Sequence, residues 1–157
     1  MISQTTEYAL RAVVALAVEP TKPMLTRDLA TLTQVPAGYL AKVLQTLGRA
    51  GLVTSAHGRG GGFTLGKPVE SITLFDVVQA VDPLQRIRTC PLGLPNHGVR
   101  LCPLHKKLDN AMATVENAFK ETTLSALLAE RNASRPLCNV AGDTHLQELI
   151  TRAVHSA

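Results

Sequence analysis

One stretch decides the fold of this chain: VPAGYLAKVLQTLGRAGLVTSAHGRGGGFTL, residues 35–65. In its first part apolar residues recur three and four positions apart, which predicts an amphipathic helix over 37–50 closed by Gly51. From Leu52 the pattern changes to two short strand-like runs around a segment with four glycines in five residues. We therefore expect a helix followed directly by a small β hairpin.

Upstream of this stretch the sequence predicts two more helices. Apolar residues at helical spacing cover 5–18, and two prolines follow that run. Thr26 is a candidate N-cap for a short helix that ends near Thr33, and Pro36 breaks the chain before the next helix. Two short helices joined by such a turn form a helix-turn-helix, whose second helix enters the major groove of DNA. The expected fold is mainly α with a small β wing, a winged helix-turn-helix.

The second half predicts one long helix flanked by short ones. Thr73 is a candidate N-cap for a short helix that stops before Pro83, and residues 84–101 are rich in loop-forming residues. The long helix should begin at Cys102-Pro103, because proline suits a first turn, and Thr123 should cap a final short helix. The long helix carries an apolar stripe: Leu104, Leu108, Ala111, Met112, Val115, Ala118 and Phe119. Since so small a body cannot cover this stripe, we expect a homodimer.

Charge is distributed unevenly along the chain. Residues 1–67 carry seven basic and three acidic side chains, an excess equal to the whole net charge of +4, whereas residues 68–157 hold nine of each. A basic module favours a polyanionic partner, because each neutralised phosphate releases condensed counterions. We therefore expect double-stranded DNA as the partner. No apolar stretch reaches the ~18 residues of a membrane helix, and no export signal is recognisable, so we expect a cytoplasmic protein without a membrane partner.

These patterns divide the chain into four segments. They are a winged helix-turn-helix domain at 1–82, a cysteine-bearing sensor loop at 83–101, a dimerisation helix with the short helix after it at 102–131, and a weakly patterned tail at 132–157. A dimer should read a palindrome whose half-sites lie about 34–36 Å apart, or a multiple of that. The candidate DNA contacts are Thr26, Arg27, Gly38, Tyr39, Leu40, Lys42, Arg49, His57, Arg59 and Gly60.

Several blocks of the sequence resemble one family. They are TTEYALRAVVALA (5–17), VPAGYLAKVLQTL (35–47), GLVTSAHGRGGGFTLGKP (51–68), ITLFDVVQAVD (72–82), CPLH (102–105) and TTLSALL (122–128). In this order they resemble the IscR, NsrR and CymR group of small dimeric winged-helix regulators, over residues 1–128. The resemblance implies a transcriptional regulator, a repressor, that responds to iron-sulfur, redox or nitric oxide status.

The resemblance also implies a set of metal ligands. Members that sense iron-sulfur status carry three cysteines before the dimer helix; this chain keeps the first, Cys90, and the last, Cys102, and lacks the middle one. His105 matches a histidine ligand of IscR-like proteins, His97 stands near the missing cysteine, and Glu7 matches an acidic position that in some relatives reaches the cluster of the opposite protomer. Thiolate and imidazole donors suit a [2Fe-2S] cluster.

Three alternatives to a cluster remain open from the residues. Two cysteines and two histidines also fit zinc, although their separations are longer than those of a zinc finger. A cofactor-free regulator could instead use a thiol switch that pairs Cys90 with Cys102 or Cys138, or could act with a protein co-regulator. Both cysteines could also be small buried residues without a redox role. Cys138 lies outside the matched blocks.

An enzyme is not expected. The sequence has no C-x-x-C motif, and its glycine run lies between two strands, where a nucleotide-binding loop would need a strand before it and a helix after it. Cys90 and Cys102 stand near histidines, as a thiol oxidoreductase would need, but without the C-x-x-C motif they do not predict one.

Overall fold

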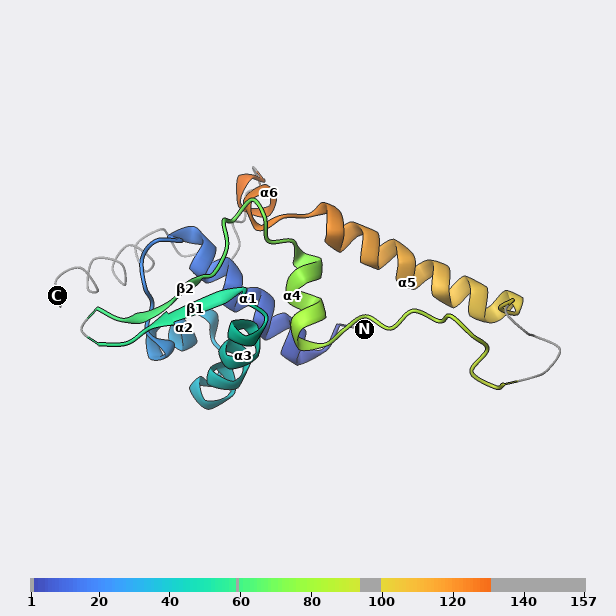
Figure 1. Ribbon diagram of the computed structural model, residues 1–157, viewed down its shortest axis with the longest axis horizontal. Coiled ribbons are helices and arrows are strands. Elements are labelled where there is room, and N and C mark those ends of the chain that lie inside the picture. Colours follow the sequence, from blue (N-terminus) through green and yellow to red (C-terminus); the bar gives the residue numbers. More distant parts are fainter. Residues whose placement is uncertain (1, 59, 94–99, 131–157) are drawn as a thin grey trace.

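A computed structural model of the chain describes residues 2–58, 60–93 and 100–130. Its elements form a helical body with a two-stranded wing and one long helix that extends away from the body (Figure 1). In chain order they are α1 Gln4–Val18, α2 Thr26–Thr33, α3 Ala37–Arg49, β1 Val53–Ala56, β2 Gly62–Leu65, α4 Leu74–Val81, α5 Pro103–Glu121 and α6 Leu124–Ala129. The predicted fold class, mainly helical with a small β wing, is confirmed.

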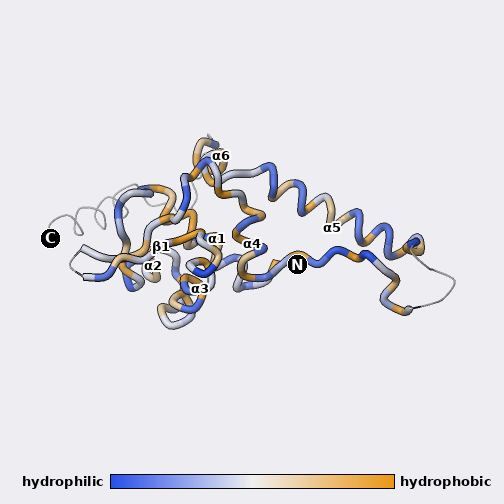
Figure 2. Tube along the Cα trace, viewed as in Figure 1, coloured by the Kyte–Doolittle hydropathy of each residue, from blue (hydrophilic) through white to orange (hydrophobic). Residues whose placement is uncertain are grey.

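Helix α1 forms the centre of the body. It begins at the N-cap Ser3, whose side chain accepts a hydrogen bond from the Thr6 backbone N–H at 3.2 Å, and α2, α3, α4, α6 and β2 all contact it. The side chains that point inward along α1 are almost all small or aliphatic: Ala9, Ala12, Val13, Val14, Ala15, Leu16 and Ala17. Apolar residues of the surrounding elements complete one core. Along α5, which extends away from the body, hydrophilic and hydrophobic residues alternate (Figure 2).

The helix-turn-helix has the predicted extent but not the predicted cap. Helix α2 begins one residue early: Leu25 is the N-cap, without a side-chain cap, and Thr26 is the first helical residue. The reason is that the Leu25 carbonyl already accepts hydrogen bonds from the backbone N–H groups of Asp28 and Leu29, at 3.1 and 3.0 Å. At the other end Gln34 adopts the left-handed conformation (φ 56°) that turns the chain into α3.

The wing is a hairpin extended by one residue from another part of the chain. β1 pairs antiparallel with β2 from Val53 opposite Leu65 to Ala56 opposite Gly62, and Met24 exchanges two backbone hydrogen bonds with Phe63 on the outer edge of β2. The pairing of Met24 with Phe63 requires glycine at position 62, because a Cβ there would lie 2.8 Å from the Met24 carbonyl. The glycine-rich run therefore allows the wing to lie close to the start of α2.

Two short helices fasten the second half to the body. Helix α4 is capped by Thr73, which forms a reciprocal capping box with Asp76, and α6 is capped by Thr123, as predicted for both. The two caps lie side by side in an antiparallel bridge, in which the Leu124 N–H donates to the Ile72 carbonyl at 2.9 Å. Leu124 is fully buried in the core, so α6 belongs to the body although the sequence grouped it with the dimerisation helix.

Helix α5 and the segment before it run side by side away from the body (Figure 1). We call residues 83–93 the strap; apart from a turn near its end, it has no regular secondary structure. Arg86 of the strap makes a bidentate ion pair with Asp109 of α5, at 2.6 and 2.7 Å, and a second ion pair with Glu116 at 3.3 Å. These side chains are only 14–23% exposed, so the network holds the strap against α5.

One further contact ties α5 to the body. Lys120 pairs with Glu116 and also lies over the ring of Phe75 in α4, 4.6 Å from its centre.

In the described part of the chain no helix is both long and apolar enough to cross a membrane. Arg59, His97, Cys138 and the tail predicted at 132–157 lie outside the described residues.

The Arg86 network should make the protein sensitive to acid. The hydrogen bonds from Arg86 lower the pKa of Asp109, and those from Lys120 and then Arg86 lower the pKa of Glu116. A carboxylate with a lowered pKa stabilises the fold above its ordinary pKa of about 4, and this stabilisation is lost as the pH falls through the lowered value. We expect Asp109→Asn to lower the melting temperature at pH 7 and to reduce its further fall at pH 3. Thermal unfolding followed by circular dichroism measures both, with the exposed Asp82→Asn as control; equal acid sensitivity in the two variants would contradict this assignment.

Candidate nucleic-acid interface and cysteine segment

Helix α3 presents one continuous exposed face to solvent. Its buried residues, Leu40, Val43, Leu44 and Leu47, pack into the core, and the exposed ones recur at intervals of three and four on the opposite side. We call this the reading face; it consists of Gly38, Ala41, Lys42, Gln45 and Arg49. In a helix-turn-helix it is the face that can enter the major groove.

The predicted contacts on α3 divide into residues of the reading face, one buried residue, and Tyr39, which lies against α1. Gly38, Lys42 and Arg49 lie on the reading face. Leu40 was a wrong prediction, because its side chain is fully buried in the core and cannot reach DNA. Sequence reasoning missed Gln45, although its spacing of three residues from Lys42 and four from Arg49 could have identified it.

Tyr39 differs from the other exposed residues of α3 because it is held by α1. It is 40% exposed, but its hydroxyl is hydrogen-bonded to the hydroxyl of Thr5. Its ring meets the ring of Tyr8 edge to face, with centroids 5.6 Å apart. Tyr39 therefore joins the first turn of α3 to the first turns of α1.

A second set of contacts connects α1 to the turn before α3. Arg11 of α1 pairs with Glu7 at 2.6 Å and donates a hydrogen bond to the Thr33 carbonyl at the end of α2, at 3.1 Å. The guanidinium also lies 5.8 Å from the centre of the Tyr8 ring. Glu7, a predicted metal ligand, thus has an ion-pair partner that contacts the helix-turn-helix.

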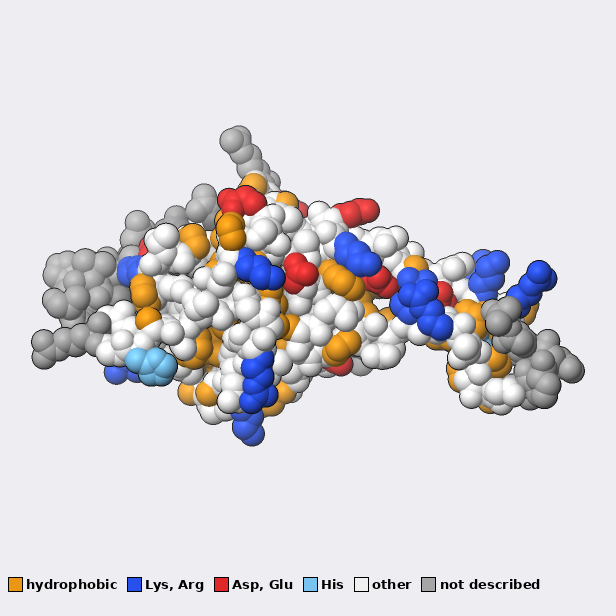
Figure 3. All heavy atoms as spheres, in the orientation of Figure 1, with side chains coloured by type: hydrophobic (Ala, Val, Ile, Leu, Met, Phe, Trp, Pro, Cys, Tyr) orange, Lys and Arg blue, Asp and Glu red, His pale blue; other side chains and the backbone are white. Residues whose placement is uncertain are grey.

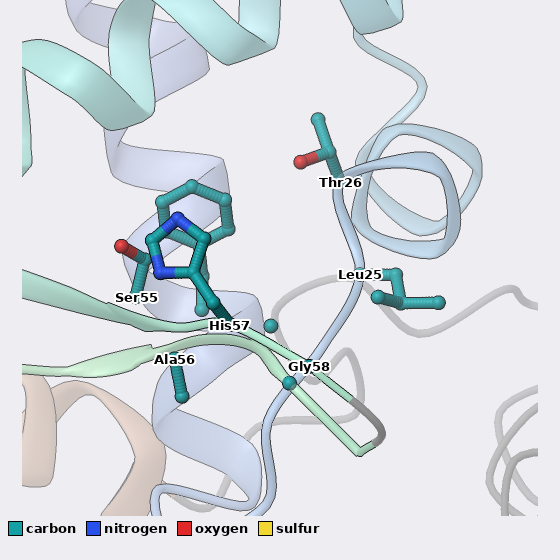
Figure 4. A pocket seen from close by; sticks show the side chains of 9 residues that line it. Leu25, Thr26, Ser55, Ala56, His57 and Gly58 are labelled. Atoms are coloured by element: carbon teal, nitrogen blue, oxygen red, sulfur yellow. The ribbon is translucent and has the colours of Figure 1, made fainter.

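An open hollow of about 310 Å³ lies between the wing and the start of α2. Thr26, from the first turn of α2, and His57, from the end of β1, both face it (Figure 4). The hollow therefore lies between two elements that carry predicted DNA contacts. Its lining residues are Leu25, Thr26, Ser55, Ala56, His57, Gly58, Gly61, Gly62 and Phe63.

The remaining predicted contacts lie at the surface around this hollow. Arg27 has a side chain that is 81% exposed, at the start of α2, and Gly60 is exposed on the wing. Lysine and arginine side chains stand out at the surface over the body and at the far end of α5 (Figure 3). Arg59 of the wing lies outside the described residues.

The cysteine segment brings together two of the predicted ligands. Cys102 is the N-cap of α5, and its Sγ lies 3.2 Å from Nδ1 of His105, one turn into the helix. Cys90 is buried near the end of the strap. Within the described ranges, no three histidine, cysteine, aspartate or glutamate side chains gather closely enough to hold a metal ion. The predicted set of Cys90, Cys102, His105 and Glu7 is therefore not assembled within one chain, and His97 lies outside the described residues.

A helix-turn-helix with an exposed recognition helix, followed directly by a β wing, defines the winged-helix class of DNA-binding proteins. Residues 2–130 match the model of the Rrf2 family, described as an iron-dependent transcriptional regulator. The chain belongs to the Rrf2 family and is a DNA-binding transcriptional regulator, not an enzyme.

Individual relatives agree with this assignment. A protein of Aquifex aeolicus (strain VF5) described as an HTH-type transcriptional regulator is 28% identical over 131 residues, which cover 82% of this chain and 91% of the relative. The structure of CymR, the global cysteine regulator of B. subtilis, is similar with a TM-score of 0.68 and 24% identity, covering 81% of this chain and 95% of that one. T. potens IscR is similar with a TM-score of 0.70 and 20% identity, covering 85% and 93%. These structural similarities establish the fold.

Substitution of Leu40 should affect stability, whereas substitution of Lys42, two residues further along α3, should affect DNA binding. Leu40→Ala removes a fully buried side chain and should lower the free energy of unfolding by about 2–5 kcal/mol. Lys42→Ala changes an exposed side chain, so it should leave stability unchanged but weaken binding to duplex DNA and reduce the slope of log affinity against log salt concentration by about one. Urea denaturation and fluorescence anisotropy measure the two effects. An unchanged salt slope in Lys42→Ala would remove this residue from the interface.

Proposed function

We propose that the protein is a homodimeric repressor that reads a palindromic operator with α3 and the wing. The observation that carries this proposal is the reading face of α3, which is exposed and basic while the opposite face anchors the helix in the core. Thr26, Arg27, Lys42 and Arg49 would contact phosphates and fix the register. His57, Arg59 and Gly60 of the wing would lie against the DNA, with Arg59 in the minor groove.

The second copy would bind along α5. None of the residues of this helix is buried, and Leu104, Leu108 and Val115 are 64%, 48% and 38% exposed on one stripe. The helix has 19 residues and is about 28 Å long, and these three side chains are spread over residues 104–115 of it. Pairing with the same stripe of another copy would remove it from water.

The dimer can be tested by placing a charge on this stripe. Leu108→Glu should convert the protein from a dimer to a monomer, because a carboxylate cannot be buried unpaired in an apolar interface. Asn110→Glu adds the same charge on another face of α5, where the side chain is exposed, and should remain dimeric. Light scattering after size-exclusion chromatography measures the mass, and a dimeric Leu108→Glu variant would rule out the stripe as the interface.

The signal would act through the cysteine segment. Cys102 and His105 supply two adjacent donors of the kinds that iron-sulfur clusters use, and the family description names iron. A [2Fe-2S] cluster would need two further donors, for which Cys90, His97 and Glu7 of a second copy are the candidates. Zinc would need the same number of donors. With its ligands in place, the cluster would supply a redox-dependent charge at the far end of α5.

A cofactor-free thiol switch is a second candidate. It is favoured by the same contact, since a cysteine beside an imidazole needs no further ligand to react, and by the incomplete ligand set within one chain. One of the similar structures is of an oxidised form of Staphylococcus aureus CymR. In this version peroxide, reduced to water, would oxidise the thiols of Cys90 and of Cys102 or Cys138 to a disulfide, and the disulfide would change DNA affinity. A protein co-regulator is the other cofactor-free version.

Metal content and a cysteine variant separate the two candidates. If a [2Fe-2S] cluster binds, anaerobically purified protein should show visible absorption with about two irons and two sulfides per site, and Cys102→Ser should lose both. The matched control is Cys138→Ser, because Cys138 lies outside the family blocks. A colourless, iron-free protein would exclude the cluster, and peroxide-dependent loss of DNA binding that is absent from Cys102→Ser would then support the thiol switch.

A further inference from the structure

The reading face of α3 offers few side chains that can distinguish bases. Gly38 has no side chain and Ala41 has only a methyl group, so the first two turns of this face carry no polar group other than Lys42. Small residues there let the helix backbone come close to the groove floor. Recognition must then depend on the long polar side chains that remain: Lys42, Gln45 and Arg49.

Tyr39 is not available to supply the missing contact. Its hydroxyl, the one polar atom of the side chain, is hydrogen-bonded to Thr5, and its ring packs edge to face on Tyr8. Reaching a base would break both contacts. Tyr39 is therefore a positioning residue, which fixes the first turn of α3 relative to α1.

Gln45 has the properties that a base-reading residue needs. It is exposed, lies between Lys42 and Arg49 on the same face, and makes no side-chain hydrogen bond within the described part of the chain. Its amide presents a donor and an acceptor together, whereas the two cationic side chains beside it can only donate. Arg49, in the last turn of α3, is placed for a phosphate contact.

We propose that Gln45 determines the sequence preference of this regulator by making a paired contact with an adenine in each half-site. The amide oxygen would accept a hydrogen bond from adenine N6, and the amide N–H would donate to adenine N7 in the major groove. Lys42, one turn earlier on the same face, would contact a phosphate and add no base preference. The inference rests on the proposed reading of an operator by α3.

The test is selection of binding sites from random duplex DNA by the full-length protein and three variants. Wild-type protein should enrich a palindrome with a fixed adenine in each half-site. Gln45→Ala should lose about tenfold or more of its discrimination at that position, with the other positions kept. Gln45→Glu should replace the adenine by cytosine, because a carboxylate accepts from cytosine N4. Gln85→Ala, an exposed glutamine of the strap, is the matched control and should select the wild-type site.

The outcomes distinguish this inference from the proposed function. If wild-type protein and Gln45→Ala select the same motif with equal discrimination, the role of Gln45 is overturned and the operator-reading function stands. If wild-type protein enriches no motif, both are overturned. Melting temperatures equal to wild type establish that the variants are folded, as expected for an exposed residue. If Gln45→Ala binds all sites more weakly and its base preference is unchanged, Gln45 contacts the DNA backbone and not a base, which would also overturn the proposal.

Discussion

The burial of α1 is the constraint on which the rest of the structure depends. Four alanines, Ala9, Ala12, Ala15 and Ala17, are at most 4% exposed on this helix, and their small side chains let the neighbouring helices approach its backbone closely. Helices α2, α3, α4 and α6 all pack on it. The two helices of the DNA-binding motif and the two that carry α5 are thus positioned by one common element.

This arrangement keeps two kinds of contact apart on α1. Its buried aliphatic side chains make apolar contacts, which have no preferred direction. Its half-buried side chains make polar contacts with defined geometry: Thr5 with Tyr39, and Arg11 with the Thr33 carbonyl. The apolar contacts hold the helix-turn-helix in the body, and the polar contacts set the orientation of its second helix.

The fold could be predicted largely from local signals. Thr73, Thr123 and the proline after Cys102 marked helix starts correctly, because capping depends on residues within one turn. Thr26 was misassigned because the Leu25 carbonyl accepts the first hydrogen bonds of the helix, so that Leu25 is the N-cap although its side chain cannot act as a cap.

The candidate site was predicted less completely, because side-chain direction and tertiary polar contacts are not local. Leu40 and Gln45 lie on the same helix, and only their rotation about its axis decides that one is buried and the other exposed. The pairing of Arg86 with Asp109 joins segments 23 residues apart, and no sequence period marks it. The cysteine positions were recognisable, but whether their side chains meet depends on the path of the strap.

The attachment of α5 has a consequence for how a dimer would respond to a signal. The helix is joined to the body at one end, through the cap of α6 and the Lys120 contact, while Cys102 and His105 lie at its other end. A tilt of α5 about its attachment to the body would therefore move the end that carries Cys102 and His105. For a helix of about 28 Å, a tilt of roughly 10° displaces the far end by about 5 Å. In the proposed dimer, a chemical event at Cys102 that tilted α5 would change the distance between the two helix-turn-helix motifs, and the internal structure of each motif would stay the same.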